Sequence, residues 1–151
     1  MELSKIKNII GNGRELSIVE PFLGTGVVSG TFGADNRCLG NDLNDNIIKF
    51  FSYAEDPTFY ETAKRLMVRE NHEHDRFYEI REAYNAMGDR GTPEAVAHLY
   101  YLQNTAHFGL YRIGKEGKYT STYHFLYRPY QFEERYAGLL RIRDKFLELH
   151  N

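Results

Sequence analysis

The sequence predicts an α/β fold in which a small parallel sheet is combined with a helical insert and a β-hairpin. Two stretches near the start indicate this class, because residues 17–22 (SIVEPF) and residues 36–43 (NRCLGNDL) each read as a short buried strand. Between them, GTGVVSGTFGA reads as a glycine turn that runs into a short helix. Two strands joined by a helical crossover are expected to pair in parallel, with a right-handed connection.

The rest of the chain is predicted to be mostly helical, because apolar residues recur at helical spacing and capping residues mark several starts. Asp56 before Pro57, and Thr92 before Pro93, each combine a good N-cap with a favourable first helical residue. Residues 110–123 instead alternate around a Gly-Lys-Glu-Gly turn, which predicts the β-hairpin. Helices are predicted over residues 44–55, 56–70, 74–88, 92–109 and 131–150.

We expect these elements to form a single domain of 151 residues with three parts. Residues 1–55 hold the strands, residues 56–130 hold the insert and the hairpin, and residues 131–151 form a C-terminal helix. A final helix can cover one face of a sheet but cannot pair with its edge. The two predicted strands would therefore keep a free edge, so we expect a homo-oligomer or a partner chain against strand 18–21.

Composition is ordinary for a globular protein and excludes few functions. The net charge of −2 gives no overall attraction to nucleic acid, but it does not exclude a local basic patch on one face. The single cysteine, Cys38, cannot form an internal disulfide, which favours a reducing compartment such as the cytoplasm. No apolar run is long enough to span a membrane. The 12 tyrosines suit either core edges or a surface that stacks on bases.

The turn between the two strands has the features of a ligand-binding loop. Gly24 and Gly26 would let the backbone approach a ligand, but Gly30 comes one residue too late for the G-x-G-x-x-G dinucleotide fingerprint. Glu20 lies on the first strand and Asp42 closes the second, where an acid can accept hydrogen bonds from ribose hydroxyls. S-adenosylmethionine (SAM), which has no phosphate, fits this pattern, although a short Gly-x-Gly segment alone is usually only a turn.

Four stretches together resemble the Dam family of DNA adenine methyltransferases, in family order: IVEPFLGTGVVSG, LGNDLNDNIIKFF, FYEIREAYN and GLYRIGKEGKYTSTY. The resemblance covers about residues 17–123. It implies a partial Rossmann-like methyltransferase sheet, SAM as cofactor, double-stranded DNA as partner, and the cytoplasm of a bacterium or a phage-infected host. It assigns cofactor binding to Glu20, Pro21, Phe22, Gly24, Gly26 and Asp42. It places DNA contacts on the hairpin, at Arg112, Lys115, Lys118 and Tyr119.

The chain also departs from that family, whose pattern after the arginine is close to R-x-N-x-x-G-x-F-N-x-P-F-G. Here Gly114, Thr120, Thr122 and His124 replace an asparagine, a second asparagine, the proline and the final glycine. The family's D-P-P-Y motif polarises the target amino group and stacks on the flipped base. None of the four prolines in this chain is adjacent to another, so the motif is absent and the catalytic residues are unknown.

Three hypotheses of different classes fit these observations. The chain could be the SAM-binding and recognition part of a Dam-like enzyme, unable to methylate alone, as in a split or truncated restriction-modification protein. It could be a repurposed, phage-type protein that degrades or sequesters SAM, or a non-enzymatic DNA-binding remnant. His72 and His74 have no third ligand at suitable spacing, so no metal site is predicted. His107 and His124 flank the hairpin and are either new acid/base groups or histidines without a role.

Overall fold

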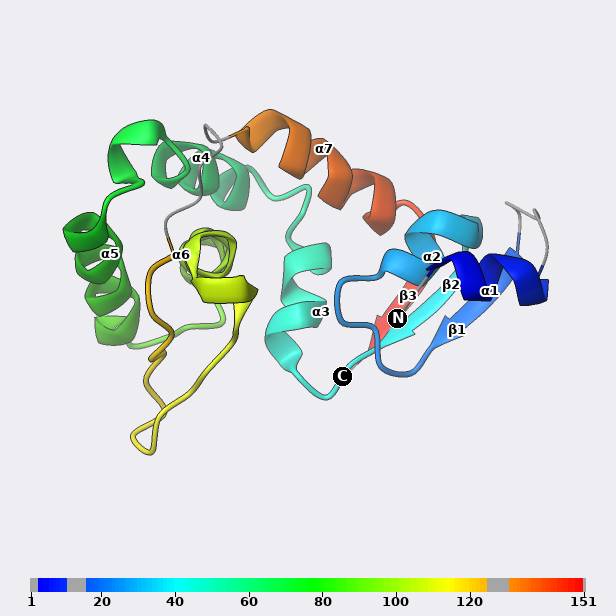
Figure 1. Cartoon of the computed structure of the whole chain (residues 1–151), viewed down its shortest axis with the longest axis horizontal. Coiled ribbons are helices and arrows are strands. Elements are labelled where there is room, and N and C mark those ends of the chain that lie inside the picture. Colours follow the sequence, from blue (N-terminus) through cyan, green and yellow to red (C-terminus); the bar gives the residue numbers. More distant parts are fainter. Residues whose placement is uncertain (1–2, 11–15, 125–130, 151) are drawn as a thin grey trace. The chain divides into compact units, whose positions relative to one another are not determined.

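The computed structural model describes residues 3–10, 16–124 and 131–150, and it has the mixed α/β architecture that the sequence predicts (Figure 1). Within these residues the strands are β1 Leu16–Glu20, β2 Gly33–Asn41 and β3 Phe146–His150. The helices are α1 Leu3–Ile10, α2 Val27–Phe32, α3 Asp45–Ser52, α4 Pro57–Leu66, α5 His74–Ala86, α6 Pro93–Thr105 and α7 Phe132–Arg143. Short 3₁₀ turns, Arg69–Asn71 and His107–Gly109, come after α4 and α6.

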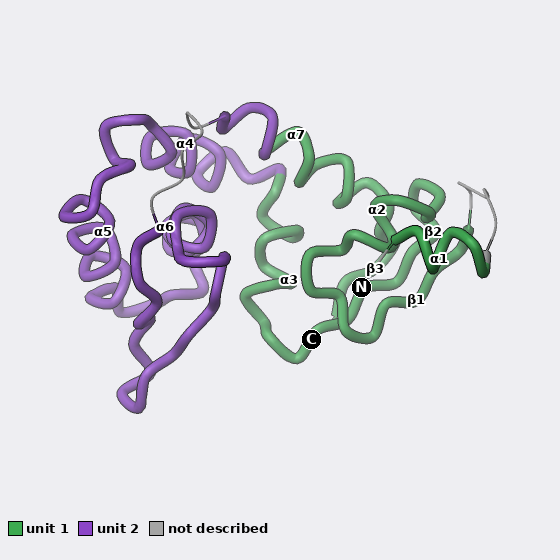
Figure 2. The backbone as a smooth tube through the Cα atoms, viewed as in Figure 1, with its two compact units in different colours: residues 1–54, 136–151 green, residues 55–135 purple. Residues whose placement is uncertain are grey.

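Contacts divide the chain into two compact units (Figure 2). Unit 1 contains residues 1–54 and 136–151, and unit 2 contains residues 55–135. The division after residue 54 lies beside the boundary predicted at residue 55, and the end of the chain belongs with the first strands. Whether the two units make a single domain stays a prediction.

Unit 1 is built on a parallel sheet of order β1-β2-β3. Helix α2 connects β1 to β2, and the pairing places Glu20 beside Gly40. On the other side of β2, Cys38 lies beside Phe146 of β3. The predicted parallel pairing of the first two strands is thereby confirmed, and their carboxyl ends lie at one edge of the sheet.

The prediction of one helix over residues 131–150 is wrong, because α7 ends at Arg143 and the chain continues as β3. The backbone of β2 explains the difference. The N–H groups of Arg37 and Cys38 both donate to the carbonyl of Lys145, at 3.2 and 2.9 Å, and the β3 ladder follows. Backbone groups of β2 that would otherwise be unpaired gain partners when residues 146–150 form a strand. This gain outweighs the helical spacing of apolar residues in that short segment. The sheet therefore has three strands in the described residues, rather than the two expected.

Phe146 anchors β3 in the core of unit 1. Its side chain is 2% exposed, and its ring centroid lies 5.7 Å from that of Phe51 on α3. A Cβ at Gly40 would lie 2.8 Å from Leu149 and 3.0 Å from the Phe146 ring, so a larger residue at this position of β2 would displace these side chains. The third strand thus packs on the sheet residues that precede Asp42.

We predict that Phe146→Ala lowers the free energy of unfolding by about 3–5 kcal/mol, because it removes a buried ring. The neighbouring Leu147, 63% exposed, is the matched control, and Leu147→Ala should change stability by no more than about 0.5 kcal/mol. Chemical denaturation measures both values. Equal losses for the two variants would contradict the placement of this strand.

Helix caps and one central helix organise unit 2. Asp56 accepts the N–H groups of Thr58 and Phe59 at 2.8 and 3.2 Å, and Thr92 accepts that of Ala95 at 3.3 Å. Both predicted caps are therefore confirmed. Helix α6 packs against α4 and α5, and most of its residues are buried, which explains why apolar residues are not confined to one of its faces.

Three of the 12 tyrosines lie deep in the core of unit 2. Tyr84, Tyr101 and Tyr119 are at most 2% exposed. The Tyr101 hydroxyl donates to the carbonyl of Asn71 at 2.6 Å, and burial raises the pKa of Tyr84 to about 12. For these three residues, packing in the core accounts for the residue type without any contact to bases.

The predicted hairpin doubles back as expected, but its antiparallel pairing is too short to form regular strands. Ile113 bridges to Tyr119, and a second bridge joins Ala106 to Tyr123 at the base. The turn contains Gly117 at φ 71°, a conformation that favours glycine. The Gly-Lys-Glu-Gly turn of the sequence therefore forms the tip of the hairpin.

Candidate functional site

The loop after β1 is fastened to the end of β2 by the carboxylate of Asp42. One oxygen of Asp42 accepts the N–H of Gly24 at 2.9 Å, and the other accepts the N–H of Asn44 at 2.9 Å. Beside this contact, the N–H of Leu23 donates to the carbonyl of Asn41 at 2.8 Å. A carboxylate oxygen has two lone pairs, so Asp42 can accept further bonds while it holds the loop.

Glu20 lies at the start of α2, although it belongs to β1. Its carboxylate accepts the N–H of Ser29 in the first turn of that helix, at 2.9 Å. An anion at a helix N-terminus satisfies an otherwise unpaired donor and complements the helix dipole. In dinucleotide-binding folds the pyrophosphate takes this place. Here a protein carboxylate takes it, which disfavours a phosphate and favours a ligand with positive charge.

The two glycines of the turn have different roles, although both have a positive φ, 51° at Gly24 and 64° at Gly26. A Cβ added at Gly26 would lie 2.7 Å from Ile142 of α7 and 3.3 Å from Phe51. A Cβ added at Gly24 would meet nothing within 4 Å. Gly26 therefore packs against the body of unit 1, whereas Gly24 borders open space that a ligand can enter.

Two large apolar side chains next to the acids are exposed. Phe22, which follows Glu20 and Pro21, is 87% exposed, and Leu43, which follows Asp42, is 95% exposed. Apolar side chains that lie open beside polar ligand-binding groups are typical of sites that an aromatic or aliphatic ligand covers. Leu43 was not predicted, although its place directly after the acid could have indicated it. Pro21 is exposed, and its carbonyl accepts a hydrogen bond from Asn41 at 3.2 Å.

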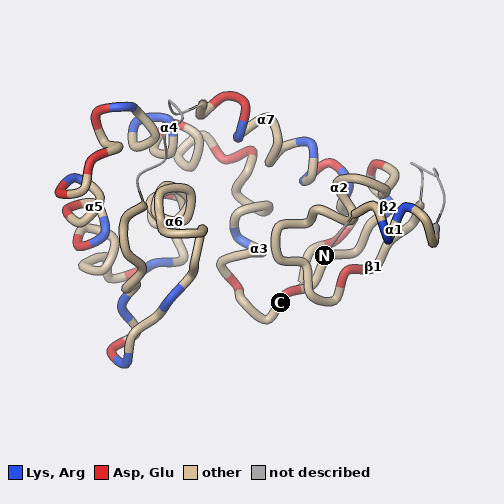
Figure 3. The backbone as a smooth tube through the Cα atoms, in the orientation of Figure 1, with Lys and Arg blue, Asp and Glu red and all other residues tan. Residues whose placement is uncertain are grey.

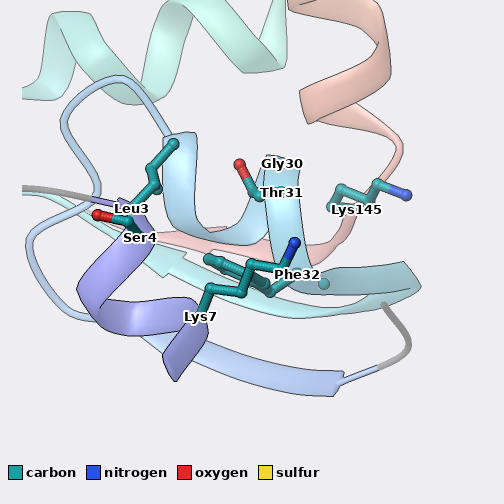
Figure 4. A pocket seen from close by; sticks show the side chains of 8 residues that line it. Leu3, Ser4, Lys7, Gly30, Thr31, Phe32 and Lys145 are labelled. Carbon is teal, nitrogen blue, oxygen red and sulfur yellow. The ribbon is translucent and has the colours of Figure 1, made fainter. Parts of the chain in front are cut away.

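A separate cavity of about 600 Å³ lies between α1 and α2 (Figure 4). Ser4 and Lys7 come from α1, Thr31 from α2 and Lys145 from the segment before β3. Lys145 also forms an ion pair with Asp35, at 2.5 Å. This cavity is lined by neither Glu20 nor Asp42, and the sequence gives no indication of it.

The hairpin of unit 2 is held against α5 by polar contacts. Asn85 of α5 accepts the Tyr119 N–H at 2.8 Å and donates to the Tyr119 carbonyl at 3.1 Å. Arg90 donates to the carbonyl of Gly117 at 2.6 Å. The Tyr119 side chain is fully buried, and its hydroxyl donates to the Leu110 carbonyl at 3.2 Å. A DNA contact by Tyr119 stays a prediction, but the buried position of its side chain indicates a role in packing.

The three predicted cationic DNA contacts, Arg112, Lys115 and Lys118, are exposed. Figure 3 marks Lys and Arg positions along the hairpin backbone in blue. Lys118 forms an ion pair with Glu116 at 2.9 Å. The hydrogen bond and charge of Glu116 raise the pKa of Lys118, and Lys118 lowers the pKa of Glu116. The hairpin therefore presents basic groups to solvent, and one of them is partly neutralised by an acid.

The parallel sheet, the glycine turn and the acids at the strand ends are together typical of proteins that bind an adenosine-type cofactor at the carboxyl edge of a sheet. The family model of the D12 class N6 adenine-specific DNA methyltransferase matches residues 2–149, and the chain belongs to this family. This membership agrees with the Dam-like resemblance of the sequence. No curated protein matches the chain. Among the described residues, no helix is long and apolar enough to cross a membrane.

We predict different outcomes for alanine at the two turn glycines. Both variants place a side chain at positive φ, which costs about 1–2 kcal/mol. Gly26→Ala should lose about 1–3 kcal/mol more in unfolding experiments, because its Cβ overlaps Ile142. Gly24→Ala serves as the matched control, since it has the same strain and open space. If the two variants unfold alike, the packing role of Gly26 is refuted.

Proposed function

We propose that this chain binds SAM at the carboxyl edge of unit 1 and is the SAM-binding and DNA-contacting part of an N6 adenine DNA methyltransferase. The observation that supports this most is the Asp42 carboxylate, which holds the open Gly24 loop and keeps spare acceptor capacity beside it. In this proposal Asp42 accepts the ribose hydroxyls of SAM. The methionine end lies along the Glu20–Gly26 turn.

The charges of the site favour SAM over a dinucleotide. Glu20 already occupies the first turn of α2, and Asp42 adds a second acid nearby in the fold. SAM brings a sulfonium and an ammonium group, which such acids attract, and it has no phosphate. The exposed side chains of Phe22 and Leu43 offer apolar surface for the adenine ring.

Methyl transfer needs a group that these residues do not supply. The lone pair of the adenine amino group is delocalised into the ring, and the family's D-P-P-Y motif is absent from this sequence. We therefore propose that another polypeptide segment provides the motif. The isolated chain would bind SAM without methylating DNA.

The outer edge of β1 is the proposed place for that segment. Within the described residues β1 pairs with β2 alone. None of its residues is buried, and Val19 is 68% exposed, whereas strands of parallel sheets are usually buried on both faces. An unpaired edge with an exposed apolar side chain suits the addition of a strand. A second copy of the chain is the alternative occupant of this edge.

Unit 2 is the proposed DNA-contacting part. Arg112 and Lys115 lie on the hairpin, which Asn85 and Arg90 fasten to α5 and the segment after it. Exposed cations on a fixed element can contact phosphates, which gives affinity and orientation without sequence reading.

We predict that SAM binds and that Asp42→Ala weakens binding by about 1.5–3 kcal/mol, the loss expected for charge-assisted hydrogen bonds. Asp45→Ala is the matched control, because it removes an acid at the start of α3 that holds neither the loop nor, in this proposal, the ribose. Calorimetry measures both affinities. Absence of SAM binding, or equal effects of the two variants, would refute the site.

We predict that the isolated chain transfers no tritium from labelled SAM to duplex DNA above background. Addition of a family segment that contains D-P-P-Y should restore transfer, and Val19→Lys at the β1 edge should weaken that restoration. Transfer by the chain alone would refute the need for a second segment. Breakdown of SAM without DNA would instead favour the repurposed SAM-degrading enzyme.

We predict opposite effects on duplex DNA affinity for two changes on the hairpin. Lys115→Ala should weaken binding and reduce the slope of log K against log salt by about 0.9, as for one lost phosphate contact. Glu116→Gln should strengthen binding, because it frees Lys118 from its ion pair. Fluorescence anisotropy at several salt concentrations measures both. Unchanged affinity in both variants would remove the hairpin from the DNA interface.

A further inference from the structure

Two histidines face each other at the base of the hairpin. The Nδ1 atoms of His107 and His124 lie 3.1 Å apart, although the residues are 17 positions apart in the sequence. The ring centroids are 4.8 Å apart at an interplanar angle of 81°. At this distance one ring donates its Nδ1 proton and the other accepts it, so a single proton joins the two rings.

The backbone fixes the positions of both residues. The N–H of His107 donates to the carbonyl of Thr122 at 2.9 Å, and the N–H of His124 donates to the carbonyl of Thr105 at 3.0 Å. The rings are also supported from one side, since the Phe108 ring lies 4.2 Å from His107 and stacks on His124 at 6.0 Å and 22°. The two nitrogens are therefore held close together by main-chain pairing as well as by their mutual bond.

We propose that His107 and His124 form a chelating site for a divalent transition metal such as Zn²⁺, which both Nδ1 atoms bind. The proton on the donating Nδ1 is released to solvent and that ring is reprotonated at Nε2, so both imidazoles stay neutral. Two imidazole nitrogens bound to a tetrahedral Zn²⁺ at about 2.0–2.1 Å lie about 3.3 Å apart. The two nitrogens need to separate by only a few tenths of an ångström. Both rings also have to turn so that their Nδ1 lone pairs converge on the metal. Neutral imidazole suits Zn²⁺, Ni²⁺ and Cu²⁺, and it suits Mg²⁺ and Ca²⁺ poorly.

The protein provides two ligands at this site. In the part of the chain that the structure describes, no group of three or more His, Cys, Asp or Glu side chains could hold a metal ion. Water therefore fills the remaining positions, and the site differs from a closed structural zinc site, which has four protein ligands. We expect moderate affinity, in the micromolar range.

The metal would close the hairpin at its base. His107 lies just after α6 and His124 lies on the returning strand, so one ion links both ends of the segment that contains Arg112 and Lys115. Because the metal binds the two histidines only when the folded hairpin holds them together, its binding free energy stabilises the folded hairpin. If the hairpin contacts DNA, as the proposed function holds, the metal would also order that surface.

Calorimetric titration of the full chain with Zn²⁺ tests the site without SAM or DNA, so its outcome is independent of the proposed function. We expect one Zn²⁺ per chain and a higher unfolding temperature with Zn²⁺. His107→Gln and His124→Gln should each weaken binding by about tenfold or more, because a chelate becomes a single ligand. Circular dichroism checks that both variants remain folded.

His74→Gln is the matched control, because His74 is another exposed histidine of unit 2 and lies in the NHEH segment. It should leave Zn²⁺ binding unchanged. The proposal is overturned if the unaltered chain binds no Zn²⁺, or if His74→Gln weakens binding as much as His107→Gln does. A Cu²⁺ electron paramagnetic resonance spectrum gives a second readout. We expect hyperfine couplings from two nitrogens in the unaltered chain, and none from this site when His107→Gln and His124→Gln are combined.

Discussion

The candidate cofactor site depends on one carboxylate that joins two loops. The loop after β1 and the segment after β2 come from different parts of the chain, and Asp42 accepts a backbone N–H from each, at Gly24 and Asn44. Hydrogen bonds to an ionised group are stronger than neutral ones, which suits this task. With the loop held there, Glu20 can reach the start of α2, and Gly24 is left facing open space.

Residues near the end of the chain pack against the side of the same loop that faces the core of unit 1. Ile142 of α7 fills the space beside Gly26 and Gly30, and Phe146 of β3 packs against Gly40. These contacts join residues more than 100 positions apart. The C-terminal segment therefore helps to hold the candidate site in place. They also explain why small residues stand at Gly26, Gly30 and Gly40, because a Cβ at any of the three would lie within 3 Å of a packed side chain.

Local patterns predicted the elements whose signals lie within a few residues of one another. The caps at Asp56 and Thr92 are such signals, and so is the strand, glycine turn and helix that begin at β1. The sequence could not predict that residues after Arg143 form a strand, because the deciding partners are the unpaired groups of β2. Nor could it distinguish Gly24 from Gly26, since the difference lies in what surrounds each one.

Side-chain roles were harder to predict than the elements that hold them. Tyr119 matches a family position on the hairpin, yet its side chain is buried. Its ring lies against that of Tyr84 on α5, and its hydroxyl donates to the Leu110 carbonyl. The approach of His107 to His124 depends on a single antiparallel bridge between the two segments. Both outcomes follow from three-dimensional contacts between residues distant in the sequence, and spacing alone does not encode them.

The placement of Glu20 at the start of α2 has a consequence for turnover. On the proposed function, the cofactor enters with a sulfonium cation and leaves as a neutral thioether once its methyl group has been transferred. Two fixed carboxylates attract the first form through its charge and lose that attraction to the second. The acids would therefore favour loading of fresh cofactor over retention of the spent one.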